Sequence, residues 1–143
     1  MKKFIEAQKR DYDIAFEEIK NGRKMNHWIW YIFPQIIGLG KTYISQYYAI
    51  KSLDEAKDYL DNDYLRENLF KITRELLLRH NNKNIVDIMN IDTMKLLSCM
   101  TLFKIADNDN ICKGIFQNVI DKFYNGKPDQ LTINILRKQE KKN

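Results

Sequence analysis

The chain has 143 residues, 44% hydrophobic and 30% charged, so it is long and apolar enough for one compact core and is neither disordered nor collagen-like. Five glycines and two prolines supply few turns, which disfavours a fold of many strands. The net charge is +5, but residues 1–10 and 137–143 each carry +3, while residues 11–136 hold 16 Lys and Arg against 17 Asp and Glu. A nucleic-acid-binding domain more often carries a basic stripe across its folded face, so we do not expect nucleic acid as the main ligand.

The N-terminal third contains one clear helix and one ambiguous aromatic segment. Apolar residues recur every three or four positions over residues 3–21, which predicts an amphipathic helix that ends at Asn21-Gly22. The aromatic-rich residues 25–33 fit either a buried strand or a short buried helix, because periodicity does not separate the two. Pro34 ends this segment, and Gly38-Leu39-Gly40 predicts an irregular connection.

The remainder of the chain is predicted to be helical. A capping box of Ser52 and Glu55 opens one helix, Asp63 is expected to cap the next, and Asp92 and Asp129 are expected to cap two later ones. The other predicted helical segments are 41–49, 85–89 and 115–123. We therefore expect an all-α fold, a single compact domain of about seven short helices in an irregular, orthogonal bundle over residues 1–136, followed by a basic, frayed tail at 137–143.

The sequence contains no export segment, no membrane span and no metal-ligand motif, and these features bear on the compartment and the cofactors. No apolar export segment follows the two N-terminal lysines, and the longest apolar run, residues 28–33, is too short for a membrane span. We expect a cytoplasmic protein with no membrane partner, in which Cys99 and Cys112 are free thiols. The cysteines and the two histidines, His27 and His80, have no close metal-ligand spacing, so we predict no metal and no cofactor.

The segment Gly38-Leu39-Gly40-Lys41-Thr42 ends like a phosphate-binding loop. That loop needs another glycine five positions before the Gly-Lys pair, and Gln35 occupies this position. A P-loop is excluded. A looser anion site formed by backbone amides after Gly40 and an ordinary glycine turn both remain open.

Two segments contain candidate functional side chains. In the aromatic segment, Trp28 and Trp30 suit either core packing or stacking on a ligand, and His27 suits either a structural role or acid–base chemistry. In the predicted helix after Asp92, Ser98 lies three residues from Lys95 on one helix face, a spacing that suits a nucleophile and its base. The alternative is that the hydroxyls of this helix, on Ser98 and Thr101, donate hydrogen bonds to backbone carbonyls of the same helix. Nothing local lowers the pKa of Cys99, and we expect His80 to be solvated beside Arg79.

These segments resemble the family called domain of unknown function 1810, which includes a group of all-α proteins termed Rv-1873-like. The resemblance covers residues 4–136 and is carried by His27-Trp28-Ile29-Trp30, by Phe33-Pro34-Gln35 and by Ser98-Cys99-Met100-Thr101-Leu102-Phe103. It implies a small, all-α, mostly bacterial and cytoplasmic protein with no established reaction. The family pattern usually has serine where this chain has Cys99, which argues against a cysteine mechanism. The resemblance also adds weight to the polar residues Lys24, Gln35, Lys95 and Thr101.

The leading hypothesis is a polar and aromatic pocket for a small anionic ligand of nucleotide or ADP-ribose type. Its catalytic candidates are His27 and Ser98, and its ligand-binding candidates are Lys24, Trp28, Trp30, Gln35, Lys95 and Thr101. Whether any bond is broken stays open. The alternative is a non-catalytic helical module that presents an exposed apolar patch to a protein partner. A third hypothesis is weak association of nucleic acid with the basic ends.

Overall fold

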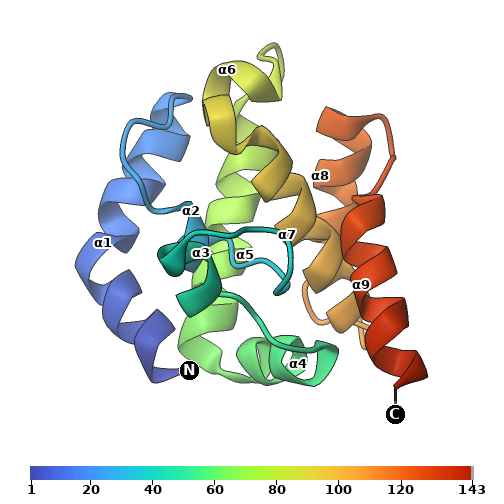
Figure 1. The fold of residues 1–143 in the computed structure, drawn as a ribbon. Coiled ribbons are helices and arrows are strands. Elements are labelled where there is room, and N and C mark those ends of the chain that lie inside the picture. Colours follow the sequence, from blue (N-terminus) through green and yellow to red (C-terminus); the bar gives the residue numbers. More distant parts are fainter. Residues whose placement is uncertain (143) are drawn as a thin grey trace.

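The computed structural model describes residues 1–142, which form nine α-helices, one 3₁₀ turn and no named strand (Figure 1). The elements are α1 (Lys2–Asn21), α2 (Ile29–Ile32), α3 (Tyr43–Tyr47), α4 (Leu53–Asp61), α5 (Asp63–Arg79), α6 (Ile85–Met89), η1 (Asn90–Asp92), α7 (Thr93–Ala106), α8 (Ile115–Tyr124) and α9 (Gln130–Lys141). The all-α prediction is confirmed. The count exceeds seven partly because the aromatic segment forms a helix of its own, α2, which is a single turn.

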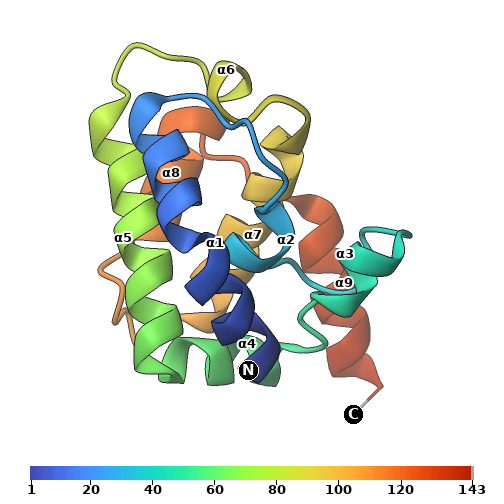
Figure 2. The same ribbon diagram turned by 90° about the vertical axis from the view of Figure 1, so that its left-hand side faces the viewer.

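Helix α7 forms the centre of the core. Every residue from Leu96 to Phe103 is buried, so the helix is enclosed on all sides, and α4, α6, α8 and α9 pack around it. Helix α1 packs against α5 and α2 (Figure 2). An apolar helix of this kind needs neighbours on every face, which explains the bundle's irregular arrangement.

Most of the predicted helix ends are confirmed. The hydroxyl of Ser52 caps α4, the carboxylate of Asp129 caps α9, and Gly22 ends α1 in the left-handed conformation with φ 77°. The prediction of Asp63 as a cap is wrong by one residue. Asn62 caps α5 instead, because its side-chain oxygen accepts a hydrogen bond from the amide of Leu65.

The prediction that His80 is solvated is also wrong. The ring is buried, and its Nε2 lies 2.5 Å from the carbonyl oxygen of Ile19 at the end of α1. Gly22 lies directly beside it: a Cβ atom there would be 2.8 Å from His80 Cε1. A glycine at this turn therefore lets α1 and the end of α5 approach closely.

Residues 36–42, which we call the glycine loop, connect α2 to α3. The loop is fixed at its base by a parallel bridge between Ile36 and Ile50, in which Ile37 N donates to Ile50 O and Ile50 N to Gln35 O, both at 2.8 Å. A Cβ atom at Gly38 would lie 3.3 Å from Ile135 Cδ1, so the loop also reaches α9. In Figure 1 it crosses in front of α7.

Two further findings concern the ends of the chain and its helices. Helix α9 continues to Lys141, and Asn143 lies outside the described residues, so the frayed tail stays a prediction. Among residues 1–142, no helix combines the length and the apolar character required to cross a membrane.

Candidate functional site

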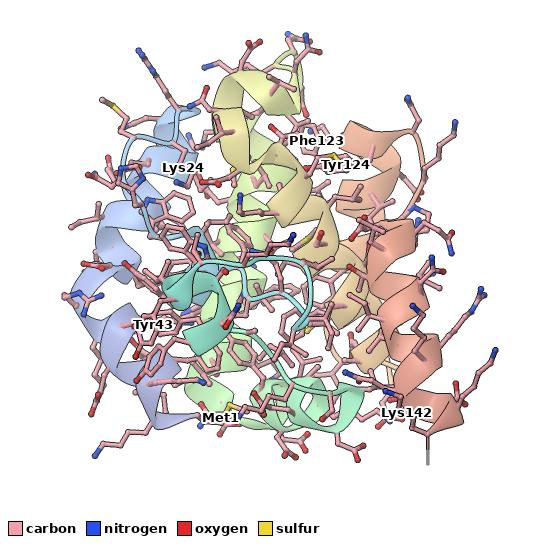
Figure 3. All side chains as sticks on the ribbon, viewed as in Figure 1. Met1, Lys24, Tyr43, Phe123, Tyr124 and Lys142 are labelled. Carbon is pink, nitrogen blue, oxygen red and sulfur yellow. The ribbon has the colours of Figure 1, made fainter. Side chains whose placement is uncertain are left out.

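Lys24 is buried at a point where three segments of the chain meet. It lies where the loop leaving α1 meets α6 and the start of α7 (Figure 3), and its backbone amide donates to Ile88 O at 2.7 Å. Its Nζ lies 2.7 Å from Asp92 Oδ2 and 4.7 Å from the centre of a Trp28 ring. Lys24 and Asp92 are only 7% and 5% exposed, so each neutralises a charge that burial alone would make costly.

Lys95 shares the same carboxylate. Its Nζ lies 3.5 Å from Asp92 Oδ1, and its side chain is 39% exposed. The structure thus brings two of the candidate lysines, Lys24 and Lys95, onto one buried aspartate, with only Lys95 reaching solvent.

Glu18 fixes the rest of this loop from α1. Its carboxylate accepts hydrogen bonds from the amides of Met25 and Asn26, from Asn26 Nδ2 and from Trp28 Nε1. Burial by itself raises the pKa of Glu18, but these four donors outweigh it and hold the pKa below its ordinary value. Trp28 is 1% exposed and belongs to the core.

Ser98 and Thr101 meet the start of α9. Ser98 Oγ lies 2.8 Å from Asp129 Oδ2, and Thr101 Oγ1 accepts a hydrogen bond from Asp129 N at 2.9 Å. The same Asp129 carboxylate accepts from Thr132 Oγ1 at 2.6 Å. Ser98 and Thr101 also lie within hydrogen-bond distance of the carbonyls one turn back in α7, at 3.0 and 2.8 Å. All four polar side chains are buried, so this cluster, which we call the α9 anchor, ties α9 to α7.

His27 lies apart from these clusters. Its side chain is exposed in the loop before α2, whereas Ser98 is buried in the α9 anchor. Among residues 1–142 no hydrogen bond joins His27 to Ser98, whose hydroxyl faces Asp129.

Trp30 and Gln35 line one small cavity together with the glycine loop, and we call it the glycine-loop hollow. Its volume is about 20 Å³, enough for one water-sized group. The amides of Gly38, Leu39 and Gly40 donate to no backbone carbonyl within residues 1–142. The hollow's other lining residues are Ile36, Ile37, Ser45, Gln46, Tyr48 and Ala49, so no carboxylate borders it.

The two thiols are held neutral. Both cysteines are free and buried; burial raises the pKa of Cys99, and burial together with the nearby Asp107 carboxylate raises that of Cys112 to about 11. Within residues 1–142, no three His, Cys, Asp or Glu side chains gather in a way that would hold a metal ion.

Sequence reasoning missed the acidic partners of its candidates. Glu18 was not singled out, and Asp92 and Asp129 were considered only as caps. One such partner has a signal in the sequence: Asp92 lies three residues before Lys95, the spacing of an ion pair along one helical turn. A polar residue that must be buried needs a partner of opposite charge or matching hydrogen-bond capacity.

A family model and a solved structure both match this chain over nearly its whole length. Residues 1–136 match a family described as a protein of unknown function, DUF1810. Among solved structures, the chain is similar to the conserved hypothetical protein Rv1873 from Mycobacterium tuberculosis, with 36% sequence identity, a TM-score of 0.90 and 95% of each chain covered. No curated protein matches.

Proposed function

This chain belongs to the DUF1810 family of proteins of unknown function, and from that premise we propose that it binds a small anionic ligand of nucleotide or ADP-ribose type at the glycine-loop hollow. One observation carries the proposal. Two candidate side chains of different chemistry, Trp30 and Gln35, line the same cavity as Gly38, Leu39 and Gly40, whose amides donate to no backbone carbonyl within residues 1–142.

The chemistry of the hollow favours an anion. Amide N–H groups without a backbone acceptor suit the oxygens of a phosphate or carboxylate, and no acidic side chain lines the cavity to repel them. Gln35 adds amide hydrogen bonds, and the half-buried Trp30 ring offers a face to a planar group.

The size of the hollow limits which part of the ligand it receives. About 20 Å³ admits one small polar group, so the remainder would lie over the exposed loop surface, where Lys41 follows Gly40 and supplies a cation. Lys95 and His27 do not line the hollow, and their substitution tests whether the remainder of the ligand reaches them.

The remaining candidates take a supporting role in this proposal. Lys24 and Trp28 hold the loop that leads into α2, and Ser98 and Thr101 hold α9, against which Gly38 lies. We propose binding and no bond-breaking step, because Ser98 is buried, faces Asp129 and does not line the hollow.

The burial of the aromatic segment counts against the protein-interaction alternative. Trp28, Tyr31, Ile32 and Phe33 are each at most 5% exposed. They therefore present no apolar patch of the several hundred Å² that a partner-binding surface shows.

A thermal-shift screen tests the proposal. The protein is heated with ADP-ribose, nucleotides, sugar phosphates and other anionic metabolites, beside the variants Gln35→Ala, Trp30→Leu, Lys95→Ala and His27→Ala. A ligand at 100 times its Kd adds about 2.7 kcal/mol of stability, which raises the melting temperature measurably.

Gln130→Ala provides the matched control, because Gln130 is an exposed glutamine at the start of α9 that does not line the hollow. We expect a ligand-induced shift in the wild type and in Gln130→Ala that is lost in Gln35→Ala and reduced in Trp30→Leu. A shift that survives both hollow variants would contradict the proposal, as would no shift with any compound.

A further inference from the structure

A second cavity lies on the other side of the molecule, between α5 and the loop that joins α7 to α8. Its volume is about 420 Å³, within the range of small-molecule sites. Figure 2 shows this loop in orange beside α5, with α3 on the opposite side of the fold. The lining residues are Arg66, Glu67, Phe70, Lys71, Arg74, Ile111, Cys112 and Lys113.

The cavity concentrates positive charge. Four cationic side chains line it against the single carboxylate of Glu67, although residues 11–136 as a whole carry 16 Lys and Arg against 17 Asp and Glu. Such a local excess raises the concentration of anions at the cavity.

Three of these cations have no acidic partner. Among residues 1–142, no carboxylate lies within 4 Å of the charged nitrogens of Lys71, Arg74 or Lys113, so their charges are not neutralised by a local ion pair. Arg74 instead lies over the ring of Phe70, with its guanidinium carbon 5.4 Å from the ring centre. Arg66 is anchored, since it donates to Leu60 O and to Asp63 Oδ1, both at 2.8 Å.

Both walls of the cavity are rigid. Arg66, Phe70 and Arg74 are spaced by four residues on α5 and so share one face of a 17-residue helix. On the opposite wall, the Asp107 carboxylate accepts hydrogen bonds from the amides of Ile111 and Cys112 at 2.8 Å each. The next residue, Lys113, has a left-handed backbone conformation with φ 58°. This conformation costs a lysine about 1 kcal/mol, and the hydrogen-bonded loop holds the residue in it.

We propose that this cavity, which we call the α5 groove, binds a small molecule that carries two or more phosphate charges. Lys71, Arg74 and Lys113 supply the charge, and Phe70 and Arg66 complete the α5 side of the lining. The groove and the glycine-loop hollow share no lining residue, so this proposal does not depend on the proposed function.

The experiment uses inorganic pyrophosphate as the probe, titrated into ¹⁵N-labelled protein at low and at physiological ionic strength. We expect saturable chemical-shift changes confined to α5 around Lys71 and Arg74 and to the loop around Lys113. The double variant Arg74→Gln/Lys113→Gln should bind at least tenfold more weakly.

The control is Lys20→Gln/Lys127→Gln, which removes the same charge from two exposed positions outside the groove. It should bind pyrophosphate as the wild type does. Equal weakening in both double variants, shifts spread over all basic positions, or no shift at the groove would each overturn the proposal.

Discussion

The Asp92 carboxylate forms ion pairs with both Lys24 and Lys95. These are the two lysines that the sequence analysis proposed as ligand-binding residues. Lys24 Nζ lies 2.7 Å from one of its oxygens and Lys95 Nζ 3.5 Å from the other. Lys24 carries a charge that burial would otherwise penalise, and the Asp92 carboxylate compensates that cost. The burial of Lys24 is thus explained by its buried carboxylate partner.

Asp92→Ala should destabilise the protein strongly. The substitution leaves the Lys24 ammonium buried without a carboxylate, and breaking a buried pair in this way costs about 3 kcal/mol. Urea unfolding measures the change, with Asp87→Ala, an exposed aspartate in α6, as the control. A loss below about 0.5 kcal/mol, the range of ordinary surface substitutions, would show that the pair does not support the fold.

Glu18 should make stability depend on acid pH. Its folded-state pKa lies below the ordinary value of 4.5 because four hydrogen bonds outweigh the effect of burial. A carboxylate with a lowered pKa contributes stability that is complete above the unfolded value and is lost as pH falls through the folded value. The wild type should therefore lose this contribution below about pH 4.5.

Glu18→Gln tests this dependence. The variant should be less stable at pH 7 and should lose less stability than the wild type as the pH falls below 4.5. Thermal unfolding followed from pH 7 to pH 3 measures both curves, and Glu17→Gln, an exposed neighbour, should parallel the wild type. Parallel curves for Glu18→Gln and the wild type would refute the role given to these hydrogen bonds.

At the scale of elements, α9 depends on the α9 anchor. Asp129 caps the helix and faces the hydroxyls of Ser98 and Thr132, while its amide donates to Thr101. Asp129→Ala removes a cap worth about 1 kcal/mol and leaves the buried Thr132 hydroxyl without its acceptor, for a combined loss of about 2–3 kcal/mol.

Amide hydrogen exchange shows which helices lose stability in Asp129→Ala. Amides of α9 should exchange faster in Asp129→Ala than in the wild type, while those of α1 and α5 keep their protection. Asp121→Ala, an exposed aspartate in α8, is the control. Unchanged protection in α9 would mean that its apolar contacts alone hold it.

The glycine loop depends on the absence of a side chain at Gly40. A Cβ atom there would lie 2.5 Å from Ser45 Oγ and 2.7 Å from Ser45 Cβ, closer than any van der Waals contact. Gly40→Ala should therefore displace the loop from α3, cost about 1–3 kcal/mol and abolish binding at the hollow.

A double-mutant cycle isolates this clash. On a Ser45→Gly background the same Gly40→Ala substitution should cost measurably less, because the atoms it meets are gone. The same cost on both backgrounds would place the effect elsewhere than in the contact with Ser45.

At the scale of the molecule, the pattern of apolar residues predicts the class and most helix ends, because periodicity and caps are local properties. The Ser52 cap of α4 and the glycine end of α1 at Gly22 are of this kind. What sequence reasoning missed depends on distant partners: His80 is buried because α1 brings the carbonyl of Ile19 to it, across 61 residues of chain. The α9 anchor likewise joins residues 31 apart, so Ser98 could be placed on a helix but not against Asp129.

The central claim is that the glycine-loop hollow receives an anionic ligand, and titration of ¹⁵N-labelled protein with ADP-ribose tests it most directly. The amides of Gly38, Leu39 and Gly40 and the indole N–H of Trp30 report on the hollow one by one. We expect saturable shifts at these four signals that are absent in Gln35→Ala. No shift, or shifts confined to other parts of the molecule such as the α5 groove, would contradict it.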